Sequence, residues 1–174
     1  IQHYSYSIFE AEVASTFNEQ ILFQHLLEQD LTPEMHAYLI GKQVDDIIAT
    51  IYRQTMFAEF EHITHQMIEA GEPLTVSSLR NAYKKLLEQY FGPGMKLEDV
   101  SDLECLRIPH FYNAFYVYKY ATGLAAAITL SDRVLNGGLP ARDQYLSFLK
   151  SGGSRYPLES LQLAGVDMKT TLPV

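Results

Sequence analysis

One histidine and four tyrosines lie close together in a short stretch of this sequence, the segment IPHFYNAFYVYKYATG at 108–123. The chain has 12 tyrosines in all, so a third of them fall in this one segment. A phenolic hydroxyl needs a hydrogen-bond partner or water, because burying it alone costs free energy. Neutral phenols and histidine can also donate hydrogen bonds to negative charge that develops during a reaction. The segment therefore either lies half-buried at a surface or supplies donors to a site.

His110 follows a proline that stiffens the backbone, and the sequence predicts a helix that begins just after it and continues to the glycine pair near position 137. On such a helix Tyr112, Tyr116 and Tyr120 would share one face, and Tyr118 would lie on a neighbouring face. A histidine at a helix N-terminus that faces a groove can stabilise an oxyanion. The alternative is a core helix whose tyrosines hydrogen-bond to buried carbonyl groups.

The other histidines are rarely spaced as metal ligands usually are. The sequence contains no H-E-x-x-H, the pattern that places two zinc ligands and a general base on one helical face. The stretch EFEHITH gives an E-x-x-H through Glu59 and His62, with His65 near the following turn. A di-iron helix bundle would need a second E-x-x-H from another helix, and the sequence has none. We therefore interpret this stretch as a partly solvated helix face.

Helical spacing of apolar residues dominates the chain, which predicts an all-α fold of about six helices. Ser7 or Ser5 can cap the first helix, and Thr32 followed by Pro33 can begin the second. The second helix would be roughly 55 Å long, which indicates a part of something larger. The expected helices cover about 7–29, 33–70, 76–91, 110–136, 140–150 and 157–164.

Composition favours a single ordinary globular domain over 1–174, with 47% hydrophobic and 20% charged residues. The net charge of −8 argues against nucleic acid or an anionic membrane as the main partner. The apolar stretches fall short of the ~20 residues of a membrane span. Cys105 is the single cysteine, so we expect no disulfide framework and a cytoplasmic location. The chain begins IQHY, without methionine, and we expect a piece of a longer chain.

Four blocks of sequence carry a family resemblance: YSIFEAEVASTFNE (6–19), RQTMFAEFE (53–61), IPHFYNAFYVYKYATG (108–123) and FLKSGGSRYPLESLQLAGVDM (148–168). Together, and in this order, they resemble the C-terminal third of oligoendopeptidase F, the bacterial branch of the thimet oligopeptidase family of zinc metallopeptidases. The resemblance runs from about residue 4 to residue 168. It implies the helical half of a zincin-type oligopeptidase, a metalloendopeptidase that hydrolyses internal bonds of short oligopeptides.

The resemblance also implies a metal ligand. In the family, H-E-x-x-H supplies two zinc-binding histidines and a glutamate that activates water, and a glutamate on a following helix is the third ligand. The matching residue here is Glu12, which precedes Val-Ala-Ser. Glu10 is the competitor, but two residues on a helix point about 200° apart, so only one can face the metal. Glu19 lies near the same helical face as Glu12, and it would support the metal ligand without binding the metal itself.

The tyrosine-rich segment acquires a role from the same resemblance. His110 and Tyr118 would donate hydrogen bonds to the oxyanion that forms when water attacks the scissile carbonyl. Tyr112 would contact the substrate backbone, and Tyr116 could exchange roles with Tyr118. The stretch KSGGSRYP at 150–157 either flanks the substrate channel or is a flexible connection between helices.

The sequence departs from the family in lacking H-E-x-x-H, which should lie upstream of residue 1. The complete enzyme would bind one zinc ion, and this chain would supply a single ligand. We therefore predict that the chain alone is inactive, and that it either associates with the missing N-terminal part or self-associates. The alternative is a non-catalytic helical module whose tyrosine-rich groove binds peptide without cutting it.

Overall fold

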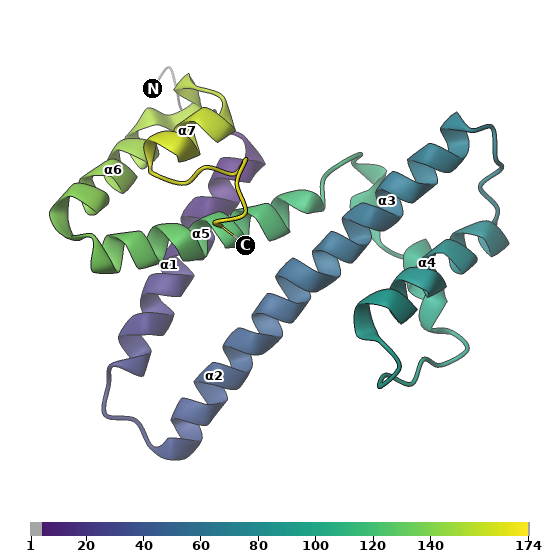
Figure 1. Cartoon of the computed structure of the whole chain (residues 1–174), viewed down its shortest axis with the longest axis horizontal. Coiled ribbons are helices and arrows are strands. Elements are labelled where there is room, and N and C mark those ends of the chain that lie inside the picture. Colours follow the sequence, from purple (N-terminus) through teal and green to yellow (C-terminus); the bar gives the residue numbers. More distant parts are fainter. Residues whose placement is uncertain (1–4, 174) are drawn as a thin grey trace. The chain divides into compact units, whose positions relative to one another are not determined.

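The computed structural model describes residues 5–173 and contains seven α-helices and no strand within that range (Figure 1). The all-α prediction is confirmed, with one helix more than expected. The helices are α1 (Ile8–Leu27), α2 (Pro33–Ile47), α3 (Arg53–Glu69), α4 (Val76–Phe91), α5 (Tyr118–Asn136), α6 (Gly138–Ser151) and α7 (Pro157–Leu163).

Local capping explains where several helices begin. The Ser7 hydroxyl accepts the backbone N–H of Glu10, and the Glu10 carboxylate accepts the Ser7 N–H, which makes a capping box at α1. Thr32 and Thr75 cap α2 and α4 in the same way through their side-chain oxygens. These polar side chains satisfy backbone donors that have no partner inside the helix.

The predicted long helix at 33–70 is confirmed as an unbroken helical stretch of backbone. It consists of α2, a π-helical segment at Ile48–Tyr52, and α3. The start of the fourth predicted helix is wrong, because the α-helical backbone begins at Tyr118 rather than directly after His110. The preceding residues form two short 3₁₀ helices, Ser101–Leu106 and Pro109–Tyr112.

The described residues form two compact units, one from positions 5–51 and 119–173 and the other from Tyr52–Tyr118. In the first unit, α1 buries Phe9, Val13 and Phe17, which lie four residues apart on one helical face. They pack with side chains from α5, α6 and the C-terminal segment, namely Ala126, Ala127, Leu130, Tyr145, Phe148, Leu161, Ala164 and Val166. The rings of Phe17 and Tyr145 stack with centroids 3.7 Å apart.

The second unit has its own core between α3 and α4. Its buried members are Met56, Phe57, Phe60, Tyr83, Leu86, Leu87, Cys105 and Val117, and Phe111 packs against them. The Tyr83 hydroxyl donates to Glu104 at 2.7 Å, and Glu104 also pairs with Arg53 and Arg107. This polar cluster satisfies a tyrosine that is completely buried.

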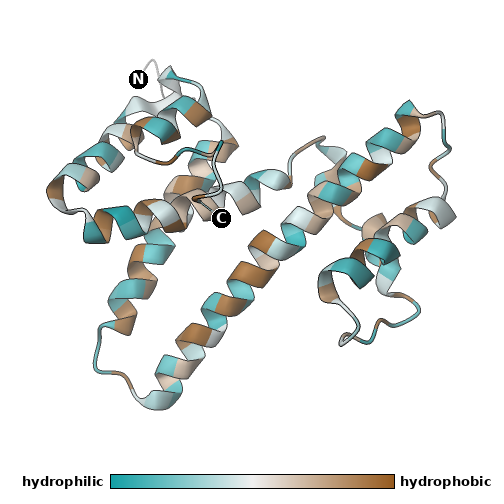
Figure 2. Cartoon of the chain, in the orientation of Figure 1, coloured by the Kyte–Doolittle hydropathy of each residue, from teal (hydrophilic) through white to brown (hydrophobic). Residues whose placement is uncertain are grey.

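Helix α2 differs from the other long helices because it buries none of its residues within the described part of the chain. Figure 2 shows apolar positions along it, and the exposed ones include Met35, Tyr38, Ile40 and Val44. Among the described helices, none combines the length and apolar character that crossing a bilayer requires.

Candidate active site

Residues 108–117 of the tyrosine-rich segment form a structured loop rather than an α-helix. Pro109–Tyr112 forms a single 3₁₀ turn, and Asn113 then takes an extended conformation with φ −114° and ψ 97°. Helix α5 begins only at Tyr118. The predicted common helical face of Tyr112, Tyr116 and Tyr120 is therefore wrong. His110 lies in the 3₁₀ turn and not at the N-terminus of a long helix.

The centre of this loop is Phe115, whose φ of +54° is the one positive value among the described non-glycine residues. A residue with a β-carbon is strained in this region and stays there only when its surroundings hold it. Here the backbone N–H of Phe115 donates to Glu61 Oε1 at 2.6 Å. The Phe115 ring also packs on the His65 ring, with centroids 4.7 Å apart. Both partners lie on α3, four residues apart, so one face of α3 holds the loop.

The candidate donors differ in their exposure. The rings of His110 and Tyr116 stack with centroids 5.7 Å apart and an interplanar angle of 22°. Tyr112 is 90% exposed and Tyr118 is 42% exposed, whereas His110 and Tyr116 are half-buried. None of these four side chains is buried, and the α-helix begins only at Tyr118, so the alternative of a core helix with buried tyrosines does not describe this part of the segment.

The candidate zinc ligand, Glu12, lies on α1 in the first unit and is half-buried. The buried Gly123 of α5 lies beside it. A β-carbon added to Gly123 would lie 3.3 Å from the Glu12 β-carbon, so the absence of a side chain at 123 lets the two helices approach closely at this point. Glu12 belongs to one compact unit, whereas His110, Tyr112, Tyr116 and Tyr118 belong to the other.

The two other glutamates of α1 have different environments. Glu10 is buried, and its Oε2 accepts hydrogen bonds from the N–H and the hydroxyl of Ser7 at 3.2 and 3.1 Å. Glu10 thus has a structural role at the beginning of α1. Glu19 is exposed and borders a hollow between α1 and α2. The assignment of Glu12 as metal ligand stays a prediction.

The EFEHITH stretch lies on α3, and both His62 and His65 are exposed. The Tyr90 hydroxyl of α4 donates to Glu59 Oε2 at 2.8 Å. Burial and this hydrogen bond raise the pKa of Tyr90 to about 12. Glu59 therefore has a structural partner, and the interpretation of the histidines as a solvated face agrees with their exposure.

A complete metal site cannot be assembled from the described residues. Between positions 5 and 173, the structure brings together no group of three histidine, cysteine, aspartate or glutamate side chains that could hold a metal ion. A catalytic zinc ion usually takes three protein ligands, so a carboxylate such as Glu12 fits only as one member of a larger set. Burial raises the pKa of the Cys105 thiol to about 11, which disfavours a thiolate nucleophile or ligand at neutral pH.

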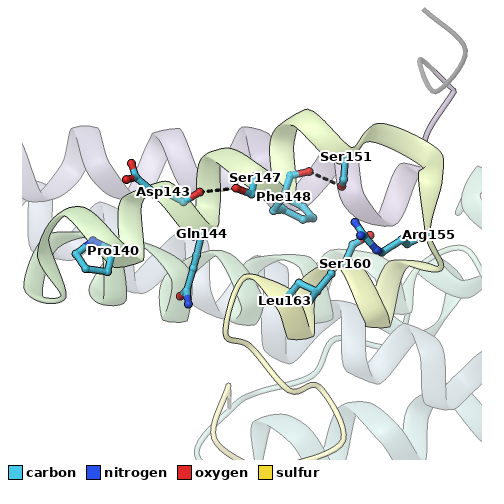
Figure 3. Close-up of a pocket in the computed structure, with 9 residues that line it drawn as sticks. All are labelled: Pro140, Asp143, Gln144, Ser147, Phe148, Ser151, Arg155, Ser160 and Leu163. Atoms are coloured by element: carbon cyan, nitrogen blue, oxygen red, sulfur yellow. Dashed lines mark hydrogen bonds between the residues drawn. The ribbon is translucent and has the colours of Figure 1, made fainter.

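The KSGGSRYP stretch lies at the edge of a hollow of about 420 Å³ between α6 and α7 (Figure 3). Ser151 and Arg155 contribute to its lining, together with Ser147 and Phe148 of α6. The glycines of the stretch form a 3₁₀ turn at Gly152–Ser154. The connection between the helices is thus a defined turn beside a hollow in the first unit.

Two residues that matter to the site geometry were missed by sequence reasoning. Glu61 is 5% exposed and supports the loop, and its signal in the sequence is its position four residues after the core residue Phe57. A charged side chain on an apolar helical face needs a partner. Gly123 carried a weaker signal, namely a glycine inside a helical pattern that continues on both sides.

The comparisons with known proteins agree with the family resemblance. The family described as Peptidase family M3 matches this sequence over residues 1–174. The chain is 52% identical to an oligoendopeptidase F homolog of Borreliella burgdorferi, covering 95% of this chain and 28% of that protein. It is 48% identical to the oligopeptidase PepF of Bacillus subtilis, covering 98% of this chain and 25% of that protein.

Comparison with solved structures also finds peptidases. The crystal structure of oligoendopeptidase-F from Enterococcus faecium matches with a TM-score of 0.90 and 43% identity, over 97% of this chain and 32% of that one. A putative peptidase from Chlamydophila abortus matches with a TM-score of 0.91 and 42% identity, over 99% and 29% of the two chains. The chain thus spans about a quarter to a third of the length of these relatives. The match over the whole sequence shows that this chain belongs to peptidase family M3.

Proposed function

We propose that this chain is the C-terminal part of a cytoplasmic zinc metalloendopeptidase that hydrolyses internal peptide bonds of short oligopeptides. The observation that carries the proposal is the arrangement of residues 109–118, in which His110 stacks on Tyr116 while Tyr112 and Tyr118 are exposed. Relatives named as oligoendopeptidases and the family match support it. The single buried thiol fits a reducing compartment.

The chain's own residues would act on the substrate as hydrogen-bond donors. When a peptide carbonyl is attacked by water, its oxygen gains negative charge, and donors already aimed at that position lower the barrier. His110 and Tyr118 are the proposed donors, with Tyr116 as the residue that could exchange with Tyr118. Tyr112, the most exposed of them, would contact the peptide backbone. Phenols suit this task because they donate while remaining neutral near pH 7.

Glu12 is the proposed metal ligand of this chain. The remaining part of the enzyme, with its H-E-x-x-H, would supply two histidine ligands and the general base. When bound, the zinc ion would supply a Lewis acid for the carbonyl and a water of lowered pKa. One carboxylate alone binds zinc weakly, so we propose that the isolated chain is inactive and that the N-terminal part of the same enzyme is its partner.

The experiment that tests this proposal uses the full-length protein that contains this chain. Zinc content and cleavage of a quenched fluorescent oligopeptide are measured before chelation, after chelation, and after zinc is returned. We expect cleavage that disappears with the metal and returns with it. A non-catalytic peptide-binding module would instead bind the uncleaved oligopeptide with the same affinity in all three states, and that result would overturn the proposal.

A further inference from the structure

The strained loop at 113–117 is held at its centre by a charged group that is almost completely buried. Glu61 is 5% exposed, and its Oε1 accepts the Phe115 N–H at 2.6 Å. A hydrogen bond to an ionised acceptor is among the strong ones in proteins. Breaking this hydrogen bond would leave the buried Glu61 carboxylate without the Phe115 donor, which costs free energy. The contact therefore has the strength to maintain an unfavourable backbone conformation.

Burial of the Phe115 side chain does not explain that conformation. The side chain is 50% exposed, and its ring packs on that of His65, which is itself exposed. The residues on either side are anchored differently. Val117 is completely buried, and the Phe111 ring lies 5.9 and 5.4 Å from the rings of Phe57 and Phe60. Apolar packing thus fixes the flanks of the loop, and Glu61 fixes its middle.

The backbone conformation at Phe115 determines the positions of the candidate hydrogen-bond donors. Tyr116 directly follows Phe115 in the chain, and its ring stacks on His110. A change of φ at Phe115 would rotate the following peptide and move Tyr116 away from His110. Tyr118, at the beginning of α5, lies three residues after Phe115. A displacement of about 1 Å in a catalytic group can lower turnover about 100-fold.

We propose that Glu61 is a positioning residue for the peptidase reaction: its buried carboxylate holds Phe115 in the left-handed conformation and thereby keeps His110 and Tyr116 stacked in one arrangement beside the substrate. The catalytic part of this inference rests on the proposed function. The hold on the loop rests on the structure alone, and the two parts can be measured separately.

The test uses four variants of the full-length protein. Glu61→Ala removes the acceptor, and Glu61→Gln restores a neutral acceptor of the same length. Glu61→Asp keeps the charge but withdraws it by one methylene group, and it serves if the alanine variant does not fold. Glu59→Ala is the matched control, because Glu59 lies on the same helix and accepts from Tyr90 instead of the loop. Circular dichroism and thermal melting confirm that each variant is folded.

The first readout is amide hydrogen exchange of peptides that cover 113–117, with peptides from α4 as the internal reference. We expect Glu61→Ala and Glu61→Asp to exchange about 10-fold faster in the loop alone. Glu61→Gln and Glu59→Ala should exchange like the wild type. Unchanged loop exchange in both the alanine and the aspartate variants would overturn the inference.

The second readout separates kcat from KM on a fluorescent oligopeptide. We expect Glu61→Ala to lower kcat about 10- to 100-fold with a small change in KM, and Glu61→Gln to recover most of the loss. Faster loop exchange with wild-type kcat would overturn the positioning role while leaving the proposed function intact. If the wild-type protein cleaves no peptide, the proposed function fails, and exchange on the same samples still decides whether Glu61 holds the loop.

Discussion

Gly123 of α5 and Glu12 of α1 are in contact at a point where a side chain on residue 123 would press on the glutamate. A β-carbon at 123 would lie 3.3 Å from the Glu12 β-carbon, closer than an ordinary van der Waals contact. Gly123 is buried, so the added methyl group would fit only if Glu12 moved by a few tenths of an ångström. The position of the proposed metal ligand thus depends on a glycine that is more than one hundred residues away in the sequence.

Substituting Gly123→Ala in the full-length protein should shift Glu12 and weaken metal binding. Overpacking at a buried contact of this kind destabilises by about 1–3 kcal/mol. We expect a lower midpoint of thermal unfolding and zinc that is lost at lower chelator concentration. Gly41→Ala is the control, because Gly41 lies on α2 with nothing within 4 Å of an added β-carbon. It should stabilise by up to ~1 kcal/mol and leave zinc unchanged. Equal zinc retention in both variants would contradict the prediction.

Removing one hydroxyl at a time should identify the oxyanion donor of the loop. Tyr118→Phe and Tyr116→Phe delete a donor while keeping the ring, and the residue that serves the oxyanion should lose about 100- to 1000-fold in kcat. His110→Ala should lose a similar factor. Tyr112→Phe should mainly raise KM, because a contact made equally in substrate and transition state affects binding. If all four variants keep kcat within about 3-fold of the wild type, the loop is not the oxyanion site.

The two glutamates of α1 should respond differently to amide substitution. Glu12→Gln should abolish tight zinc binding in the full-length protein, because it removes a charged ligand. Glu10→Gln should keep zinc and cost about 0.5–2 kcal/mol in stability, since it weakens the capping box with Ser7. Atomic absorption and thermal melting provide the two measurements. Loss of zinc in the Glu10 variant with retention in the Glu12 variant would reverse the assignment.

Ionisation of the buried Tyr145 hydroxyl should lower the stability of the protein at alkaline pH. Burial raises its pKa to about 12, above its ordinary value of ~10, and its hydroxyl is buried without a hydrogen-bond partner among the described residues. The folded state therefore holds the proton more tightly than the unfolded state. Its contribution is fully present below about pH 10 and is lost as pH rises toward 12. Tyr145→Phe should be neutral or stabilising near pH 8, within about 1 kcal/mol, and should flatten the alkaline decline of the melting temperature.

The substitution Tyr83→Phe should have a different effect on stability from Tyr145→Phe. Burial and the hydrogen bond to Glu104 raise the pKa of Tyr83 still further, and here the hydroxyl has a partner. Removing it should destabilise by about 1–3 kcal/mol near pH 8, because Glu104 loses a donor. Equal melting temperatures for the two phenylalanine variants would show that the hydroxyl of Tyr83 contributes nothing specific.

Most helix positions could be predicted because their signals are local. The N-cap residues Ser7, Thr32 and Thr75 and the proline at the beginning of α2 act on their immediate neighbours, so the sequence placed α1, α2 and α4 well. The π-helical segment between α2 and α3 has no such signal, because apolar spacing continues through it.

The loop at 113–117 could not be predicted from periodicity. Its apolar residues continue the helical spacing, and the break depends on a hydrogen bond to Glu61, 54 residues earlier in the sequence. A tertiary contact thus overrides the local pattern. His110 and the tyrosines stood out by their clustering, but their specific roles came from the family resemblance. Glu12 came from the resemblance entirely, since charge and spacing alone would leave it an ordinary helix glutamate.

The most direct test of the central claim is the zinc content of the isolated 174-residue chain, measured together with cleavage of a quenched fluorescent oligopeptide. The intact mass and helical content of the sample are confirmed first. We predict negligible zinc and no cleavage, with both appearing when the proposed N-terminal part of the enzyme is added back, and only if Glu12 is intact. Stoichiometric zinc with cleavage by the chain alone would contradict the account, and His62 and His65 would then be the first residues to substitute.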